Sequence, residues 1–153
     1  MPLSHINHFA FLVPGNYTDE DPARGLEDTL GLFELGERLG YGSAWVRQRH
    51  LERGVSSAAT FLAAASQRTK TIGLGTAVIQ LGYENPFRLA EDLATVDALS
   101  RGRLNAGVSA GPPPFAPLLG DLSSTPWTGS ISAMPAPKGW RGRFPARRWR
   151  AKP

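Results

Sequence analysis

Three consecutive segments in the middle of this chain establish its fold class. Residues 71–81 read TIGLGTAVIQL, residues 85–99 read NPFRLAEDLATVDAL, and residues 103–111 read RLNAGVSAG. The first segment is apolar and uncharged, as expected of a strand that is buried on both faces. Asn85 followed by Pro86 predicts a helix start, because asparagine caps free N–H groups and proline suits the first turn. Strand, helix and strand in this order predict a βαβ unit and therefore a parallel sheet.

The same alternation continues toward the N-terminus. An apolar run at residues 6–13 predicts a strand, and the spacing of apolar residues over 26–39 predicts a helix. Residues 43–46 form a short second strand in this interpretation, followed by an alanine-rich helix that begins at the serines 56–57 and ends at Arg68. We therefore expect four strands and three helices in strict alternation. This is half of an eight-stranded β/α barrel or the start of a doubly wound sheet.

Length and composition limit the classes of protein to which this chain can belong. At 153 residues, the chain has room for one domain with a sizeable core. It contains no cysteine, which excludes disulfides and thiolate metal sites, and we predict no metal site. It has no apolar run long enough to span a bilayer and no secretory pattern at its start. We therefore expect a cytoplasmic protein without membrane contact.

The composition changes after Gly111. Nine of the 13 prolines lie from Pro112 onward, where seven lysines and arginines face a single acidic residue, Asp121. Residues 1–111 therefore carry a net charge of −2, although the whole chain carries +4. We expect residues 1–111 to form a partial barrel and residues 112–153 to form a disordered, basic, Pro/Arg-rich tail.

Two alternatives for the tail stay open. Its arginines alternate with Trp127, Trp140 and Trp149, which suits contacts with nucleic-acid phosphates and bases. We favour a disordered end over a nucleic-acid-binding one. A GC-rich gene that is read out of frame would also produce such a composition. In that hypothesis the chain is the front of a longer enzyme.

Four segments of the chain carry a family pattern. They read YGSAWV at 41–46, GLGTAV at 73–78, NPFRLAED at 85–92 and LSRGRL at 99–104. In this order and at this spacing, they resemble the N-terminal part of the bacterial luciferase-like family of flavin-dependent monooxygenases and oxidoreductases. The resemblance runs from residue 5 to about residue 119. It implies a (β/α)8 barrel of the TIM type, truncated here to about the first four strands and three helices.

The resemblance also implies a chemistry. Such enzymes oxidise an organic substrate with reduced flavin and oxygen, and some relatives use a deazaflavin and no oxygen. We therefore expect FMN as the cofactor, a deazaflavin coenzyme as its alternative, and a truncated enzyme that is weakly active or inactive. The rival hypothesis is a non-enzymatic fragment or interaction module whose basic tail binds acidic partners.

Candidate site residues follow from the barrel geometry, in which ligands sit at the carboxyl ends of the strands. His50, just past the second strand, is the candidate catalytic residue because imidazole transfers protons near neutral pH. The candidate flavin-binding residues are Thr76, Ala77, Ser109 and Gly111, because small residues let the backbone approach the flavin. Close packing of strand against helix would also favour small residues at these positions.

The sequence departs from the family pattern at two points. Residues 48–50 read QRH where the family often has EHH, and Ala110 stands where an arginine frequently helps to hold the flavin phosphate. Luciferase-like proteins also often have a non-proline cis peptide at the position of Ala77 and Val78. In a truncated barrel we expect a trans bond there. We also expect an unpaired strand edge through which copies of the chain associate.

Overall fold

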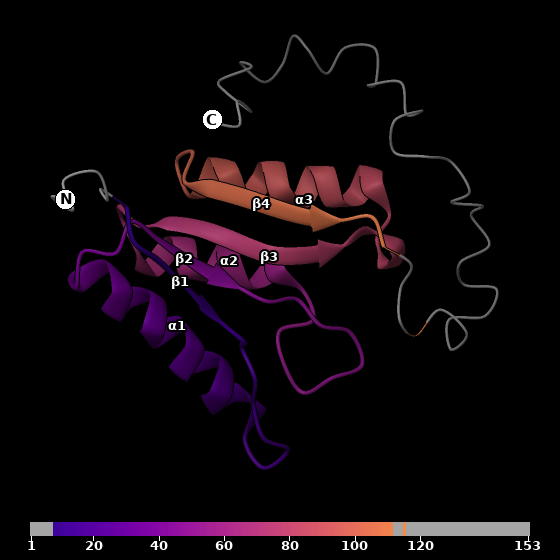
Figure 1. Cartoon of the computed structure of the whole chain (residues 1–153), viewed down its shortest axis with the longest axis horizontal. Coiled ribbons are helices and arrows are strands. Elements are labelled where there is room, and N and C mark those ends of the chain that lie inside the picture. Colours follow the sequence, from indigo (N-terminus) through magenta and orange to yellow (C-terminus); the bar gives the residue numbers. More distant parts are fainter. Residues whose placement is uncertain (1–7, 112–114, 116–153) are drawn as a thin grey trace, which may run out of the picture. The chain divides into compact units, whose positions relative to one another are not determined.

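The computed structural model describes residues 8–111 and Phe115 (Figure 1). The disorder and the nucleic-acid contacts considered for the tail therefore concern positions that lie, apart from Phe115, outside the described residues. All described helices and strands belong to the unit Met1–Pro114. Within the described ranges, no helix is long and apolar enough to cross a membrane.

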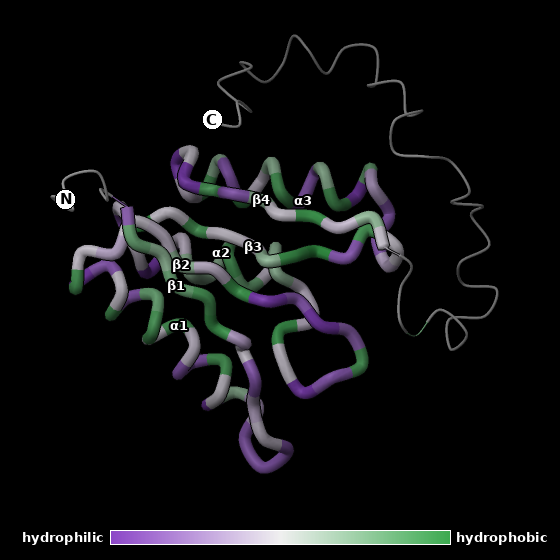
Figure 2. Tube along the Cα trace, in the orientation of Figure 1, coloured by the Kyte–Doolittle hydropathy of each residue, from purple (hydrophilic) through white to green (hydrophobic). Residues whose placement is uncertain are grey.

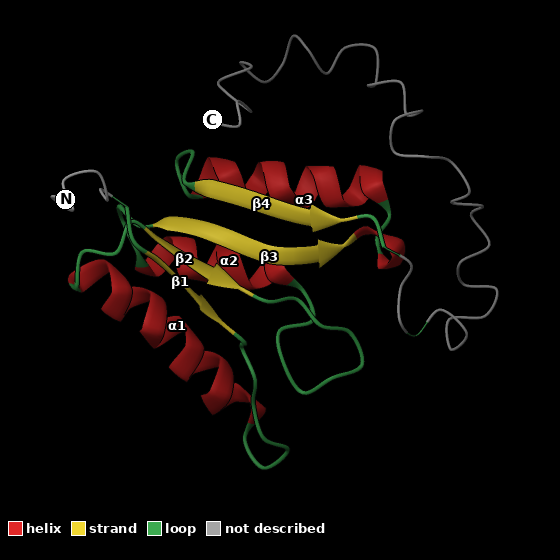
Figure 3. Ribbon diagram, viewed as in Figure 1, coloured by secondary structure: helices red, strands yellow, loops and turns green. Residues whose placement is uncertain are grey.

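Strands and helices alternate strictly, as predicted. The strands are all parallel and lie side by side in chain order, β1-β2-β3-β4 (Figure 3). This sequential order is that of a β/α barrel. The element bounds are β1 Ala10–Val13, α1 Pro22–Arg38, β2 Ser43–Val46, α2 Ala58–Arg68, β3 Gly73–Gln80, η1 Leu81–Tyr83, α3 Pro86–Leu99 and β4 Leu104–Ser109.

All three α-helices cover the same face of the sheet. Consecutive helices contact each other, α1 with α2 and α2 with α3, as expected when each crossover returns on one side (Figure 1). A doubly wound sheet would place helices on both faces and would reverse the strand order at one point. The structure therefore confirms the barrel-type alternative for this part of the chain.

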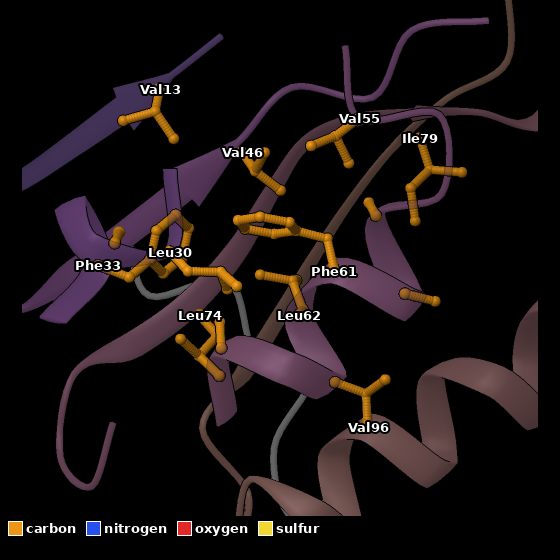
Figure 4. Packing of buried hydrophobic residues seen from close by; sticks show 14 of the residues in the cluster. Val13, Leu30, Phe33, Val46, Val55, Phe61, Leu62, Leu74, Ile79 and Val96 are labelled. Carbon is orange, nitrogen blue, oxygen red and sulfur yellow. The ribbon is translucent and has the colours of Figure 1, made fainter. Parts of the chain in front are cut away.

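The hydrophobic core lies between the sheet and these helices (Figure 4). Phe33 of α1 and Phe61 of α2 are buried and meet edge to face, with ring centroids 5.5 Å apart. Burying each such side chain contributes roughly 1.5–3 kcal/mol. The buried apolar cluster consists of Val13, Leu30, Phe33, Ala44, Val46, Val55, Ala58, Ala59, Phe61, Leu62, Ala65, Ile72, Leu74, Ile79, Leu89 and Val96.

The opposite face of the sheet is open among the described residues. One row across it consists of Leu12, Trp45, Gly75 and Asn105, one residue from each strand. Leu12 is 54% exposed. The indole of Trp45 packs directly on Gly75. A Cβ added to Gly75 would lie 2.2 Å from the nearest atom of the ring. In a closed barrel this face lines the interior.

Local sequence signals begin α2 and α3 where predicted, whereas α1 begins at Pro22, capped by Asp21, before the predicted start at residue 26. Asn85 Oδ1 accepts a hydrogen bond from the backbone N–H of Arg88 at 3.0 Å, at the start of α3. Ser57 Oγ accepts one from Thr60 N–H at 3.4 Å, at the start of α2. Gly102, just past α3, has a positive φ of 81°.

The chain turns hydrophilic directly after β2, where a loop with several charged residues begins (Figure 2).

The peptide bond between Ala77 and Val78 is cis. The expectation of a trans bond is therefore wrong. The neighbouring strand β4 already flanks this bond, because the β3–β4 ladder shifts its register between Thr76 and Ile79 and continues beyond it.

Glu37, near the end of α1, holds the amino-terminal edge of the sheet. Its carboxylate accepts hydrogen bonds from the backbone N–H groups of Lys70, Thr71 and Ile72, at 2.5–3.1 Å. Burial alone would raise the pKa of Glu37. These hydrogen bonds and one from the Thr71 hydroxyl outweigh burial and lower the pKa from 4.5 to about 2. The carboxylate thereby fastens α1 to the segment that leads into β3.

Arg103 closes the same edge between α2, α3 and β4. Its guanidinium donates five hydrogen bonds of 2.8–3.0 Å. The acceptors are the carbonyl oxygens of Ser66, Thr69, Ile72 and Ser100 and the hydroxyl of Thr69. Burial lowers the pKa of Arg103. Residues at this end of a β/α barrel serve stability, so we assign Arg103 to the fold.

Candidate functional site

The loops that follow β1 and β2 join at the carboxyl edge of the sheet. Asn16 and Gly54 form an isolated antiparallel bridge, and the Tyr17 N–H donates to the carbonyl oxygen of Arg53 at 3.2 Å. The Arg53 side chain also pairs with Asp19. A shallow cleft on these loops is lined by Asn16, Tyr17, Leu51, Glu52 and Arg53. The joined loops flank the edge at which β/α barrels bind their ligands.

Gln48 lies at this edge, two residues past β2, and is only 3% exposed. Its Oε1 accepts a hydrogen bond from the backbone N–H of Ala58, the first residue of α2, at 2.8 Å. Its Nε2 lies 2.7 Å from Glu84 Oε1 and 3.0 Å from His50 Nε2. One buried amide therefore connects the loop after β2, the start of α2 and the turn before α3.

His50, the predicted catalytic residue, is held in this cluster. Its ring packs on Tyr83, with centroids 4.3 Å apart and an interplanar angle of 39°. Its Nε2 lies 4.0 Å from Glu84 Oε1, beyond hydrogen-bond distance. The imidazole thus has an aromatic support, one hydrogen-bond partner and a nearby carboxylate, which suits a group that handles protons. Its catalytic role stays a prediction.

Arg49, which replaces a histidine often found in the family, lies outside this network. Its Nε forms a 3.9 Å ion pair with Glu52, and its backbone N–H donates to the Val55 carbonyl oxygen at 2.9 Å. The structure therefore places Arg49 in the loop that follows β2, whereas Gln48 and His50 form the polar cluster.

Thr76, one of the four candidate flavin-binding residues, lies within the sheet. It is fully buried, and its hydroxyl donates to the Gly107 carbonyl oxygen at 2.8 Å and accepts from the Gly107 N–H at 2.9 Å. This gives Thr76 a role in joining β3 to β4. A contact between Thr76 and flavin stays a prediction.

Ala77, Ser109 and Gly111 lie closer to the open carboxyl edge. Ala77 and Ser109 are half-buried, and Gly111 is exposed. Val78 is 37% exposed, and its side chain lies beside Gly107. The ends of β3 and β4 therefore present a small and largely apolar surface. Such a surface fits the face of a flavin ring.

The same edge offers less to a flavin phosphate. Ala110 is exposed and stands where the family resemblance implies an arginine. Arg88, in the first turn of α3, already pairs with Glu91 at 3.6 Å and with Asp92 at 3.2 Å. Residues 104–111 contain no lysine or arginine. The end of β4 therefore offers no cation to a phosphate, and the arginines that most closely follow a described strand in the sequence are Arg47 and Arg49, after β2.

The sequence places Gln48 beside His50 after the second strand but gives it no role, and it does not single out Glu84. Each is a polar residue a few positions past the carboxyl end of a strand, and that position was a usable signal. Their contact with each other has no sequence signature, because 36 positions separate them.

The strand order, the helices on one face and the polar cluster at the carboxyl edge define a protein of the β/α-barrel class with its candidate site at the strand ends. Within this class, the chain belongs to the luciferase-like monooxygenase family. The sequence model of that family matches residues 6–129. This match confirms the resemblance that the four sequence segments indicated.

Curated relatives match the same part of the chain. It is 40% identical over 112 residues to limonene 1,2-monooxygenase of Rhodococcus erythropolis, in an alignment that covers 71% of this chain and 29% of that enzyme. It is 38% identical over 111 residues to 4-hydroxyprotoasukamycin monooxygenase of Streptomyces nodosus subsp. asukaensis, covering 71% and 30%. The chain therefore spans less than a third of the length of these relatives.

Solved structures share the fold. The monooxygenase RslO1 of Streptomyces bottropensis aligns with a TM-score of 0.60 at 30% identity, over 66% of this chain and 32% of that one. The oxygenating constituent of 3,6-diketocamphane monooxygenase of Pseudomonas putida, solved with FMN, aligns with a TM-score of 0.59 over 68% and 29%. The coenzyme F420 dependent tetrahydromethanopterin reductase of Methanopyrus kandleri aligns with a TM-score of 0.57 over 68% and 27%. At 15% and 22% identity, the last two show the fold alone.

Proposed function

We propose that this chain is a luciferase-like flavin-dependent oxidoreductase or monooxygenase, which oxidises an organic substrate with reduced FMN and oxygen. A deazaflavin coenzyme is the alternative cofactor, since both cofactor types occur among the solved structures of this fold. One observation carries the proposal. The cluster of Gln48, His50 and Glu84 lies at the same edge of a parallel sheet as the small, apolar ends of β3 and β4.

The residues of this chain would hold and orient the cofactor and the substrate. Ala77, Val78 and Ser109 offer the surface for the ring, and Gly111 lets the backbone approach it. When bound, reduced flavin would donate its electrons to oxygen and so activate it to oxidise the substrate. His50, on the neighbouring strand end, would hold a proton at the edge of the site.

This chain alone should bind flavin weakly and turn over slowly or not at all. β/α barrels commonly hold phosphate with the loops after the seventh and eighth strands, whereas the described residues form four strands. Ala110 removes a further phosphate contact. Among the described strands, β1 and β4 each have an unpaired edge, so we also propose that copies of the chain associate through these edges.

A titration of the purified chain with FMN, followed by quenching of flavin fluorescence, tests both parts of the proposal. We expect a saturable signal that excess ATP does not compete away, with a dissociation constant weaker than low micromolar. Tight binding in the low micromolar range would contradict the weakness of the site. A signal that never saturates, or that ATP abolishes, would contradict flavin recognition itself. Size-exclusion chromatography of the same sample should show oligomers, and a strict monomer would contradict the edge association.

A further inference from the structure

The orientation of the Gln48 side chain is determined by its three partners. Its oxygen receives the N–H of Ala58, and its nitrogen faces the carboxylate of Glu84. The flipped amide would place oxygen against a carboxylate and NH2 against an N–H group. Both contacts are repulsive, so the hydrogen-bond network itself identifies the oxygen and the nitrogen.

The same network assigns the ring proton of His50. The amide nitrogen of Gln48 carries two hydrogens. One is donated to Glu84 Oε1 at 2.7 Å, and the other points to His50 Nε2 at 3.0 Å. Because Gln48 is the donor in the second bond, His50 Nε2 must accept and carries no proton. The proton of the neutral imidazole therefore sits on Nδ1.

We propose that Gln48 is a positioning residue that holds His50 in the Nδ1–H tautomer. This inference rests on the proposed function, in which His50 is the proton-handling group. Free histidine favours the opposite tautomer, so the amide reverses an intrinsic preference. Glu84 acts through Gln48, because its carboxylate lies 4.0 Å from His50 Nε2 while it receives the first amide hydrogen.

The assignment has a mechanistic consequence. While the hydrogen bond from the Gln48 amide is in place, the lone pair of His50 Nε2 is occupied, so Nε2 cannot accept a proton from a substrate. Among the described residues, none hydrogen-bonds Nδ1. His50 therefore meets a bound substrate or cofactor as a hydrogen-bond donor through Nδ1–H, and it acts as a base only after its bond with Gln48 breaks.

The test is an NMR measurement of the imidazole nitrogens in the full, 15N-labelled chain without flavin. It is recorded at about pH 8, above the range in which histidine ordinarily titrates. The His50 signals are identified by their loss in His50→Gln. We expect a protonated Nδ1, an unprotonated Nε2, and a tautomer ratio shifted at least about fivefold toward Nδ1–H relative to free histidine. A protonated Nε2 in the wild-type chain would overturn the proposal without any variant being needed.

Gln48→Glu separates positioning from general support of the fold. Glutamate keeps the shape and the acceptor for Ala58 but has no N–H to donate. Its carboxyl group and that of Glu84, 2.7 Å away, would share one proton and leave none for His50, so Nε2 of His50 should become protonated. Gln67→Glu, at an exposed position of α2, is the matched control and should leave the His50 signals unchanged. A folded Gln48→Glu chain with the wild-type nitrogen pattern would refute the role of Gln48. Because no flavin is present, failure here is distinct from failure of the FMN titration.

Discussion

The hydroxyl of Thr76 exchanges two hydrogen bonds with the backbone of Gly107, at 2.8 and 2.9 Å, where the register of β3 and β4 shifts. A Cβ on Gly107 would lie 2.3 Å from the carbonyl oxygen of Thr76. The two strands therefore approach at this point as closely as a glycine allows. The contact shapes the open surface that we propose for the flavin ring.

Gly107→Ala should destabilise the fold by about 1–3 kcal/mol, because the added methyl group must push the backbone of β4 away from that of β3. Urea denaturation followed by circular dichroism measures the effect. The control is Gly31→Ala in α1, where a Cβ would meet nothing within 4 Å. That change should be neutral or stabilise by up to about 1 kcal/mol. Equal midpoints for Gly107→Ala and the wild type would contradict the close approach.

Glu37→Gln should remove pH-dependent stability from the wild-type chain. The pKa of Glu37 is depressed from 4.5 to about 2, so its contribution is complete above pH 4.5 and is lost as the pH falls toward 2. At neutral pH we expect a loss of about 1.5–3 kcal/mol, the range for hydrogen bonds to a charged group.

Urea midpoints measured at several pH values check this prediction. The wild-type and Glu37→Gln curves should converge as the pH falls through the window from 4.5 to about 2. Glu20→Gln, an exposed position in the first loop, should run parallel to the wild type throughout. If the urea midpoints of the wild type and Glu37→Gln differed by the same amount at every pH, the effect would come from packing and not from the charge of Glu37.

Arg103→Lys should destabilise the chain by about 2–4 kcal/mol, although it keeps the positive charge. Lysine has three donors and no planar fork, so at least two of the five acceptors around Arg103 lose their partner. Arg101→Lys, at an exposed turn position nearby, should change stability by less than about 0.5 kcal/mol. Thermal melts of both variants make the comparison, and similar melting temperatures would refute the role of the guanidinium fork.

Ala110→Arg should restore a phosphate contact at the exposed end of β4. A charge-assisted hydrogen bond is worth about 1.5–3 kcal/mol, so we expect FMN to bind roughly ten- to a hundredfold more tightly. Riboflavin, which has the same ring but no phosphate, should bind both chains equally. If the variant gained the same factor in affinity for riboflavin as for FMN, the effect would come from contact with the ring and not with the phosphate.

The order of the elements could be read from the sequence because the signals for it are local. Asn85 and Ser57 cap helices by binding N–H groups three residues away, and Gly102 takes the positive φ that follows α3. The uncharged, apolar composition of residues 71–81 marks them as a strand, although Thr71 and Val78 within them are exposed. These interactions need no partner from elsewhere in the chain, so pattern and propensity predict them.

The choice between a barrel and a doubly wound sheet was made by packing, since it depends on which face each helix covers. The same holds for the pairs that join distant segments. Glu37 meets Thr71 across 34 positions, Thr76 meets Gly107 across 31, and Gln48 meets Glu84 across 36. Residue type alone gives such pairs no signature. His50 could be named from its place after a strand, but its proton-bearing nitrogen follows from the orientation of the neighbouring Gln48 amide, which Glu84 and Ala58 determine.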